Sequence, residues 1–109
     1  MIKSLSLLTR KSSMTREEFR SVWESEHAPL VRAVPEVRRY VLSFVIGEPT
    51  KANVPIQAMQ VDAMAELWYD DVAAMQRAAA RPEMKAVLDN GAKHLGAIKS
   101  FVTEEVSVI

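Results

Sequence analysis

Residues 15–34 read TREEFRSVWESEHAPLVRAV, and this stretch decides how the first part of the chain folds. Its apolar residues recur at spacings of three and four, which predicts a helix with one buried face. They are Phe19, Val22, Trp23, Leu30, Val31 and Val34. Thr15 followed by Glu18 forms a capping box, which predicts that the helix begins here. Pro35 fits a stop just beyond its end.

His27 falls on the same apolar face, one turn after Trp23. A buried imidazole needs partners for both ring nitrogens, or it serves as an acid, a base or a ligand. Pro29 has no amide hydrogen to donate to the carbonyl of Ser25, so the helix should bend or break nearby. We therefore expect a ligand pocket at His27. The alternative is a core histidine that is satisfied by a backbone carbonyl.

Outside this helix, the period-two alternation of apolar residues and the turn residues predict the remaining elements. We expect strands at 2–9, 37–47, 63–69 and 101–108, and helices from Asp70 or Asp71 through Ala80 and from Pro82 to Asn90-Gly91. Residues 92–99 should form an irregular turn, and residues 48–62, with two prolines, the longest loop. The order β-α-β-β-α-β is typical of an α+β, ferredoxin-like domain, here spanning 1–109. It has an antiparallel four-stranded sheet with the helices on one face.

Composition narrows the possible functions. The chain has 14 basic and 14 acidic residues and no cysteine. This balance does not favour binding to nucleic acid or to an anionic membrane surface. Disulfides and cysteine chemistry are excluded, and no metal-ligand spacing such as His-x-x-x-His occurs. The N-terminal residues predict a strand rather than a signal peptide, and no stretch has the ~20 apolar residues of a membrane span, so we expect a cytoplasmic protein.

The strand patterns also predict an assembly. Tyr40, Leu42 and Phe44 share one face of their strand, and Met64 and Trp68 share one face of the next. If these residues together form the face that the helices leave open, that face is too apolar for water. Packing two sheets face to face would bury it and enclose a space for a small ligand. We therefore expect a homodimer formed through the sheet faces.

Several segments resemble a known family. TREEFRSVWESEHAPLV, VRRY, DAMAELWYDD and FVTEEV are similar to the EthD-like branch of the dimeric α+β barrel superfamily. The most specific combination is a helix with tryptophan followed by His-Ala-Pro-Leu, and then a strand reading Ala-Glu-Leu-Trp. Within the family, GEPTKANVP, VDAMAELWY and FVTEE are most similar to members that isomerise methylmuconolactones.

The resemblance implies a barrel dimer with one pocket per subunit, between the sheet and the first helix. It implies no metal, haem or flavin cofactor. His27 matches the pocket histidine of the family, and Tyr40 matches an aromatic position that lines the pocket. Asn53 stands where the muconolactone isomerases have a second histidine. An amide can hydrogen-bond a carboxylate or carbonyl, but it cannot shuttle a proton.

Other side chains are candidates for shaping the site, each with a structural alternative. Trp23 is either a wall of the pocket or a core residue. Tyr40 either donates its hydroxyl to a substrate oxygen or packs in the dimer. Trp68 is expected to shape the cavity. Asn53 and its loop either close the pocket or form a simple surface connection.

Two ionisable residues complete the set of candidates. Glu66 interrupts an apolar strand. It either acts as a base or pairs with His27, or it forms an ion pair with Arg38 or Arg39 or is exposed at a sheet edge. His94 follows the predicted helix end. It is either exposed or a replacement for the missing second histidine.

These expectations combine into one leading hypothesis and two alternatives. The chain would be a cofactor-free isomerase that acts on a small lactone or carboxylated intermediate of aromatic breakdown, with His27 as the general acid and base. It could instead be a non-catalytic protein that binds a small molecule, or an accessory protein of a degradation pathway. A cofactor-independent oxygenase is the third possibility.

Overall fold

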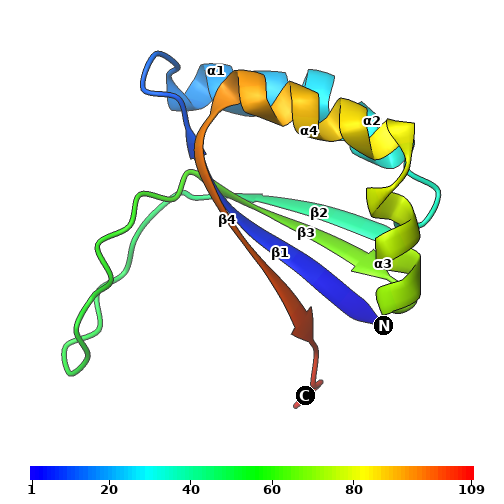
Figure 1. The fold of residues 1–109 in the computed structure, drawn as a ribbon. Coiled ribbons are helices and arrows are strands. Elements are labelled where there is room, and N and C mark those ends of the chain that lie inside the picture. Colours follow the sequence, from blue (N-terminus) through cyan, green and yellow to red (C-terminus); the bar gives the residue numbers. More distant parts are fainter.

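A four-stranded antiparallel sheet forms one layer of the molecule, and helices cover one of its faces (Figure 1). The computed structural model describes residues 1–109. The strands are β1 (Ile2–Arg10), β2 (Arg39–Phe44), β3 (Ala63–Tyr69) and β4 (Leu95–Glu104), in the spatial order β2-β3-β1-β4. The predicted ferredoxin-like β-α-β-β-α-β arrangement is confirmed.

The first helical segment begins at the residue that the capping box predicts. The Thr15 side chain accepts the backbone N–H of Glu18, and the Glu18 carboxylate accepts that of Thr15. The helix then runs as α1 (Arg16–Val22), the π-helix η1 (Trp23–His27) and α2 (Ala28–Arg32). In η1 the N–H of Ala28 bonds to the carbonyl of Trp23, five residues back. The expected irregularity is thus a widened π turn just before Pro29, a feature often found at functional sites.

The second helical segment of the chain, which contains α3 and α4, ends later than predicted. α3 (Val72–Ala79) is capped by the Asp71 side chain, as expected, and α4 begins at Pro82. α4 does not end at Asn90-Gly91 but continues to His94, and β4 follows directly. The predicted turn over 92–99 and the predicted start of the last strand at 101 are therefore wrong. The Asn90 side chain is buried and has side-chain partners, so it does not act as a C-cap.

The register of the strands corrects the predicted faces. Tyr40 lies opposite Leu67, and Leu42 lies opposite Ala65. Directly opposed residues project to the same side of a sheet, so Tyr40 and Leu42 face the helices together with Leu67 and Ala65. Met64 and Trp68, one residue out of phase on β3, face the other way. The expectation that Tyr40, Leu42 and Phe44 share the open face with Met64 and Trp68 is wrong.

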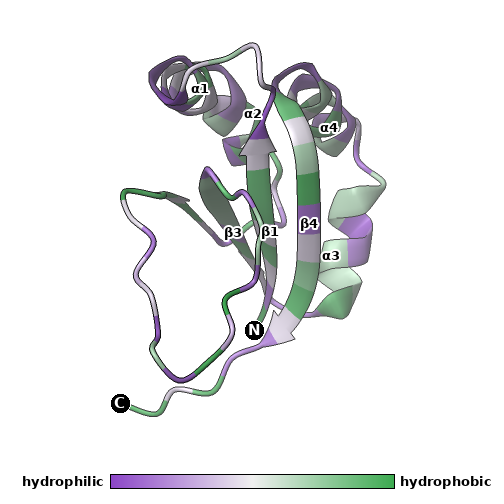
Figure 2. Cartoon of the chain, turned by 90° about the vertical axis from the view of Figure 1, so that its left-hand side faces the viewer, coloured by the Kyte–Doolittle hydropathy of each residue, from purple (hydrophilic) through white to green (hydrophobic).

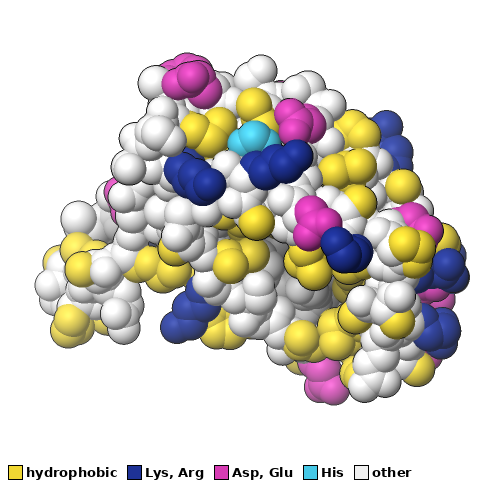
Figure 3. Space-filling view, turned by 45° about the horizontal axis from the view of Figure 1, so that its top comes forward, with side chains coloured by type: hydrophobic (Ala, Val, Ile, Leu, Met, Phe, Trp, Pro, Cys, Tyr) yellow, Lys and Arg dark blue, Asp and Glu magenta, His cyan; other side chains and the backbone are white.

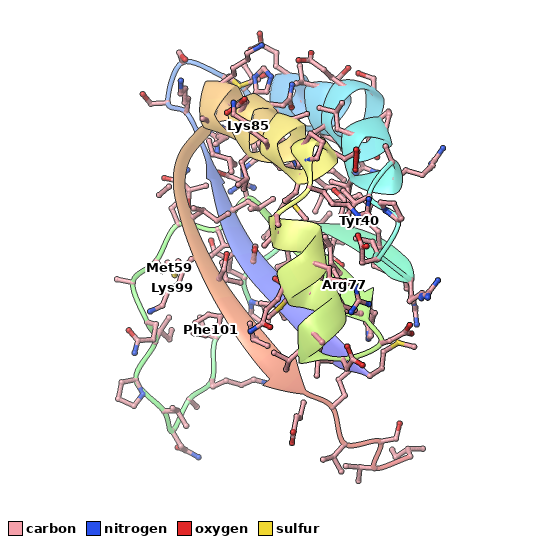
Figure 4. The ribbon with its side chains drawn as sticks, turned by 45° about the vertical axis from the view of Figure 1, so that its right-hand side comes forward. Tyr40, Met59, Arg77, Lys85, Lys99 and Phe101 are labelled. Atoms are coloured by element: carbon pink, nitrogen blue, oxygen red, sulfur yellow. The ribbon has the colours of Figure 1, made fainter.

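The open face still carries exposed apolar side chains. Met64 is 36% exposed and Phe101 is 44% exposed. Hydrophobic and hydrophilic residues are interspersed along β4 (Figure 2). Figure 4 shows Tyr40 on the helix side of the sheet and Lys99 and Phe101 on the other. An ion pair also lies on this open face, where the Lys3 ammonium is 2.8 Å from the Glu66 carboxylate.

Two hydrophobic clusters join the helices to the sheet. One contains Phe19 and Trp23 packed on β1 and β3, and its members are Leu8, Phe19, Trp23, Ala63 and Ala65. The other joins α2, α3 and α4, and its members are Val31, Val34, Tyr69, Ala74, Ala78 and Val87. The predicted apolar helical face is thus inside the molecule, with Val22 and Leu30 half-buried.

The segment between β2 and β3, residues 45–62, projects away from the sheet (Figure 1). It exposes apolar side chains such as Val54 and Ile56. Its C-terminal end is fixed by Asp62, whose buried carboxylate accepts from the backbone and side chain of Arg10. None of the helices has the length and apolar character needed to cross a membrane.

Candidate functional site

A cavity of about 460 Å³ lies between the helix side of the sheet and the helices η1 and α4. Fourteen of its 20 lining residues are hydrophobic, so the few polar groups on its wall stand out. Trp23, His27 and Tyr40 are among the lining residues. This volume is within the range of about 300–1,000 Å³ that is common for small-molecule pockets. The structure therefore brings three of the predicted site residues to one cavity.

The π turn places two aromatic rings of the site against each other. The Trp23 and His27 rings stack with centroids 3.6 Å apart and an angle of 17° between their planes. α4 passes close to this stack at Gly91, where an added Cβ would lie 3.6 Å from His27 Cε1. His27 is only 5% exposed. Its ring is thus held from one side by Trp23 and approached from another by the backbone of α4.

An amide links His27 to a carboxylate at the surface. Nδ1 of His27 lies 2.9 Å from Oδ1 of Asn90, and Nδ2 of Asn90 donates to Oε1 of Glu26 over 2.7 Å. Nε2 of His94 lies 3.5 Å from the same Glu26 oxygen. On the helical side of the molecule, a histidine reaches the surface among acidic and basic side chains (Figure 3). Asn90 is the buried member of this chain of contacts, at 6% exposure.

Burial controls the protonation of the site. It lowers the pKa of His27 below its usual value, and the hydrogen bond to Asn90 opposes part of that change. The hydrogen bond from Asn90 lowers the pKa of Glu26, with a smaller contribution from His94. At neutral pH the imidazole of His27 is therefore neutral, and the carboxylate of Glu26 is ionised.

Two further polar atoms of the site have no partner. The hydroxyl of Tyr40 and the indole nitrogen of Trp23 are buried, and neither makes a hydrogen bond. Burial raises the pKa of Tyr40 to about 12, and the nearby Trp23 indole opposes part of the rise. Buried donors without partners cost free energy, which a ligand oxygen would recover. Two unpartnered donors thus belong to residues that line the same cavity as the neutral imidazole of His27.

The other predicted site residues lie elsewhere. Glu66 and Trp68 are on the open face of the sheet, because β3 alternates and Leu67 takes the cavity side. The partner of Glu66 is Lys3, so its predicted pairing with His27, or with Arg38 or Arg39, is wrong.

Asn53 is an exposed residue of the long segment and does not line the cavity. No group of three His, Cys, Asp or Glu side chains is placed to hold a metal ion.

Three residues of the site, Glu26, Asn90 and Gly91, are not predicted from the sequence. Local patterns place a helix end at Asn90 and Gly91, since Asn-Gly often follows the last turn, and they place Glu26 on the solvated helix face. Glu26 is exposed, yet its carboxylate is held by Asn90. The position of Glu26 next to His27 in the sequence is a local signal that it belongs to the site. Nothing local points to Asn90, which is 63 residues away from His27.

Solved structures of similar fold place the molecule among ferredoxin-like proteins. An ethyl tert-butyl ether d (EthD) family protein from Bacillus halodurans C-125 is similar with a TM-score of 0.79 and 25% identity, covering 97% of this chain and 99% of that chain. A dimeric ferredoxin-like protein from Thermobifida fusca YX shares the fold, with a TM-score of 0.69 at 18% identity. That match covers 94% of this chain and 88% of the other.

The sequence comparison agrees with the fold. The 4-carboxymethyl-4-methylbutenolide mutase from Pseudomonas reinekei is 32% identical over 107 residues, which cover 97% of this chain and 99% of the mutase. The EthD domain family matches residues 11–95, a range that contains η1 and all of α4. The resemblance noted in the sequence is thus confirmed, and the chain belongs to the EthD-domain family.

Proposed function

We propose that the chain is an isomerase that acts on a small carboxylated lactone by proton transfer, without a cofactor. The observation that carries this proposal is that one cavity is lined by the neutral imidazole of His27 and by Trp23 and Tyr40, whose buried donors have no partner. The similarity to a butenolide mutase supports the choice of substrate class.

In the proposed reaction, His27 is the general base and then the general acid. In 4-carboxymethyl-4-methylbutenolide, C4 carries no proton, so the neutral imidazole takes one from the CH₂ next to the carboxylate while the C4–O bond of the lactone breaks. A carboxylate oxygen then adds to a different carbon of the resulting diene, and the imidazolium returns the proton to the adjacent carbon, which closes an isomeric lactone. The hydroxyl of Tyr40 and the indole N–H of Trp23 donate to the oxygen on which negative charge develops. The apolar walls surround the rest of the lactone. Such an isomerisation involves no net oxidation or reduction, and the proton that His27 takes up is the one that it returns.

The function is tested by turnover of 4-carboxymethyl-4-methylbutenolide, followed by NMR of the substrate without added metal or cofactor. Appearance of an isomer supports the proposal. Tight binding with the compound returned unchanged would favour the non-catalytic alternative. Oxygen consumption with an electron-rich phenol, and no isomerisation of the lactone, would favour an oxygenase.

The donor role predicts a specific loss on substitution. Trp23→Phe keeps an aromatic ring but removes the indole N–H, and Tyr40→Phe removes only the hydroxyl. A hydrogen bond to a charged group contributes about 1.5–3 kcal/mol. We therefore expect each variant to lower kcat/KM for the butenolide by about 10- to 100-fold.

The matched control is Trp68→Phe, which makes the same change on the opposite face of the sheet. It is expected to keep wild-type turnover. Equal losses in Trp23→Phe and Trp68→Phe would contradict the placement of the site in this cavity.

We also propose that two copies associate through the open face of the sheet, as an assembly that buries its exposed Met64 and Phe101. The ferredoxin-like protein from Thermobifida fusca YX, which shares the fold, is dimeric. Phe101→Glu would place a carboxylate in this interface, where desolvation costs several kcal/mol. We expect the dissociation constant of the dimer to rise by about 100-fold or more.

Light scattering after size-exclusion chromatography measures this change. Leu88→Glu adds the same charge on exposed α4 and should leave the dimer intact. A Phe101→Glu protein that remains dimeric at low micromolar concentration would contradict the proposed interface.

A further inference from the structure

A buried amide connects two parts of the chain that lie far apart in the sequence. Glu26 and His27 are neighbours in η1, and the Asn90 side chain of α4 contacts both of them, over 2.7 and 2.9 Å. With 6% exposure for Asn90 and 5% for His27, there is little room for water to replace these bonds. The three side chains form one continuous path from the surface carboxylate to the cavity.

The chemistry of the three groups fixes the direction of every bond. An ionised carboxylate only accepts hydrogen bonds, so the NH₂ of Asn90 must point at Glu26. The carbonyl oxygen of Asn90 then points at His27 and can only accept. Nδ1 of a neutral His27 must therefore carry the proton. Nε2 keeps its lone pair, and it makes no hydrogen bond within the chain.

The tautomer decides what the imidazole can do. A neutral histidine with its proton on Nε2 would present a donor on that nitrogen, and it could not act there as a base. The stacking of the ring on Trp23 restricts its tilt but does not choose between the two nitrogens. Among the groups that contact the ring, only Asn90 makes that choice.

We propose that Asn90, oriented by the carboxylate of Glu26, is a positioning residue that holds His27 as the Nδ1–H tautomer with the Nε2 lone pair free for the substrate. The inference rests on the proposed function for the role of His27 as a base. The tautomer itself is independent of that function.

The test is ¹⁵N NMR of histidine-labelled protein at a pH where His27 is neutral, because protonated and unprotonated ring nitrogens have well-separated shifts. His94→Gln assigns the signals, since the chain has two histidines. The informative variants are Asn90→Leu, which removes the acceptor, and Glu26→Ala, which removes the group that orients the amide. Glu24→Ala is the matched control, because Glu24 is exposed in the same π turn and pairs with Arg20.

We expect the wild type and Glu24→Ala to show the Nδ1–H pattern. Asn90→Leu should show the Nε2–H form, and Glu26→Ala a mixture of both. In the turnover assay, kcat should fall by about 10- to 100-fold in Asn90→Leu, as when metal-bound histidines lose an orienting partner, while KM changes little. If Asn90→Leu fails to fold, the exposed Glu26→Ala decides the question.

An Nε2–H pattern in the wild type would overturn the inference, and so would an Nδ1–H pattern that persists in both variants. These outcomes are separate from the proposed function. A protein with the expected tautomers that leaves butenolides unchanged would refute the isomerase proposal but retain the positioning role. Turnover of the butenolide by a protein whose His27 is in the Nε2–H form would support the isomerase proposal and refute the positioning role.

Discussion

His27→Gln is expected to lower kcat/KM for the butenolide by about 10²- to 10⁴-fold, the usual contribution of a general acid or base. Glutamine can still donate to Asn90 and fill most of the ring's space, but it has no nitrogen that takes up a proton near neutral pH. Steady-state turnover of the wild type and the variant measures the loss. Circular dichroism shows whether the variant stays folded.

The pH profile of the wild type adds an independent check on the same residue. The base works in its neutral form, and burial lowers the pKa of His27 below the ordinary value of about 6.5. kcat/KM should therefore stay level at neutral pH and fall only as the pH drops through a value below 6.5. Near-wild-type turnover in His27→Gln, or an acid limb above 6.5, would contradict the assignment.

Phe19→Ala is expected to cost about 3–5 kcal/mol in the free energy of unfolding, the range for a large aromatic removed from a core. Phe19 is 1% exposed, and its ring stacks on Trp23 with centroids 5.0 Å apart. The neighbouring Ala63 and Ala65 are too small to fill the space that would be left. A single domain is stable by only about 5–15 kcal/mol, so this loss is a large fraction of the total.

Urea unfolding at one fixed protein concentration measures this loss, because association would make the midpoint depend on concentration. Ile46→Ala is the control, since Ile46 is 97% exposed, and we expect a change within about 0.5 kcal/mol. A Phe19→Ala midpoint equal to that of the control would show that the cluster at α1 does not support the fold.

Local signals in the sequence are sufficient for most of the elements. The capping box at Thr15 predicts the start of the first helix, and alternation predicts β3 with its observed bounds. The burial of His27 also follows from helical spacing alone. These features depend on neighbours within a few residues, and the backbone repeats of 3.6 and two residues make such neighbours visible in a sequence.

Alternation cannot say which face of a strand meets the helices. It groups Tyr40 with Leu42 and Met64 with Trp68, but only the pairing of β2 with β3 shows that these two groups lie on opposite sides. A shift of one residue in register would exchange the faces, so two patterns that are each correct can be combined wrongly. This error places Trp68 in the expected pocket.

The β-α-β-β-α-β order and a buried histidine in the first helix both follow from local periodicity, so they are visible in the amino-acid sequence. The continuation of α4 through Asn90, and the link that this amide makes between His27 and Glu26, depend on long-range contacts in the fold. A buried polar group is stable only with partners, and the partners of Asn90 are more than 60 residues away in the sequence. A local Asn-Gly signal for a helix end was overridden by those contacts.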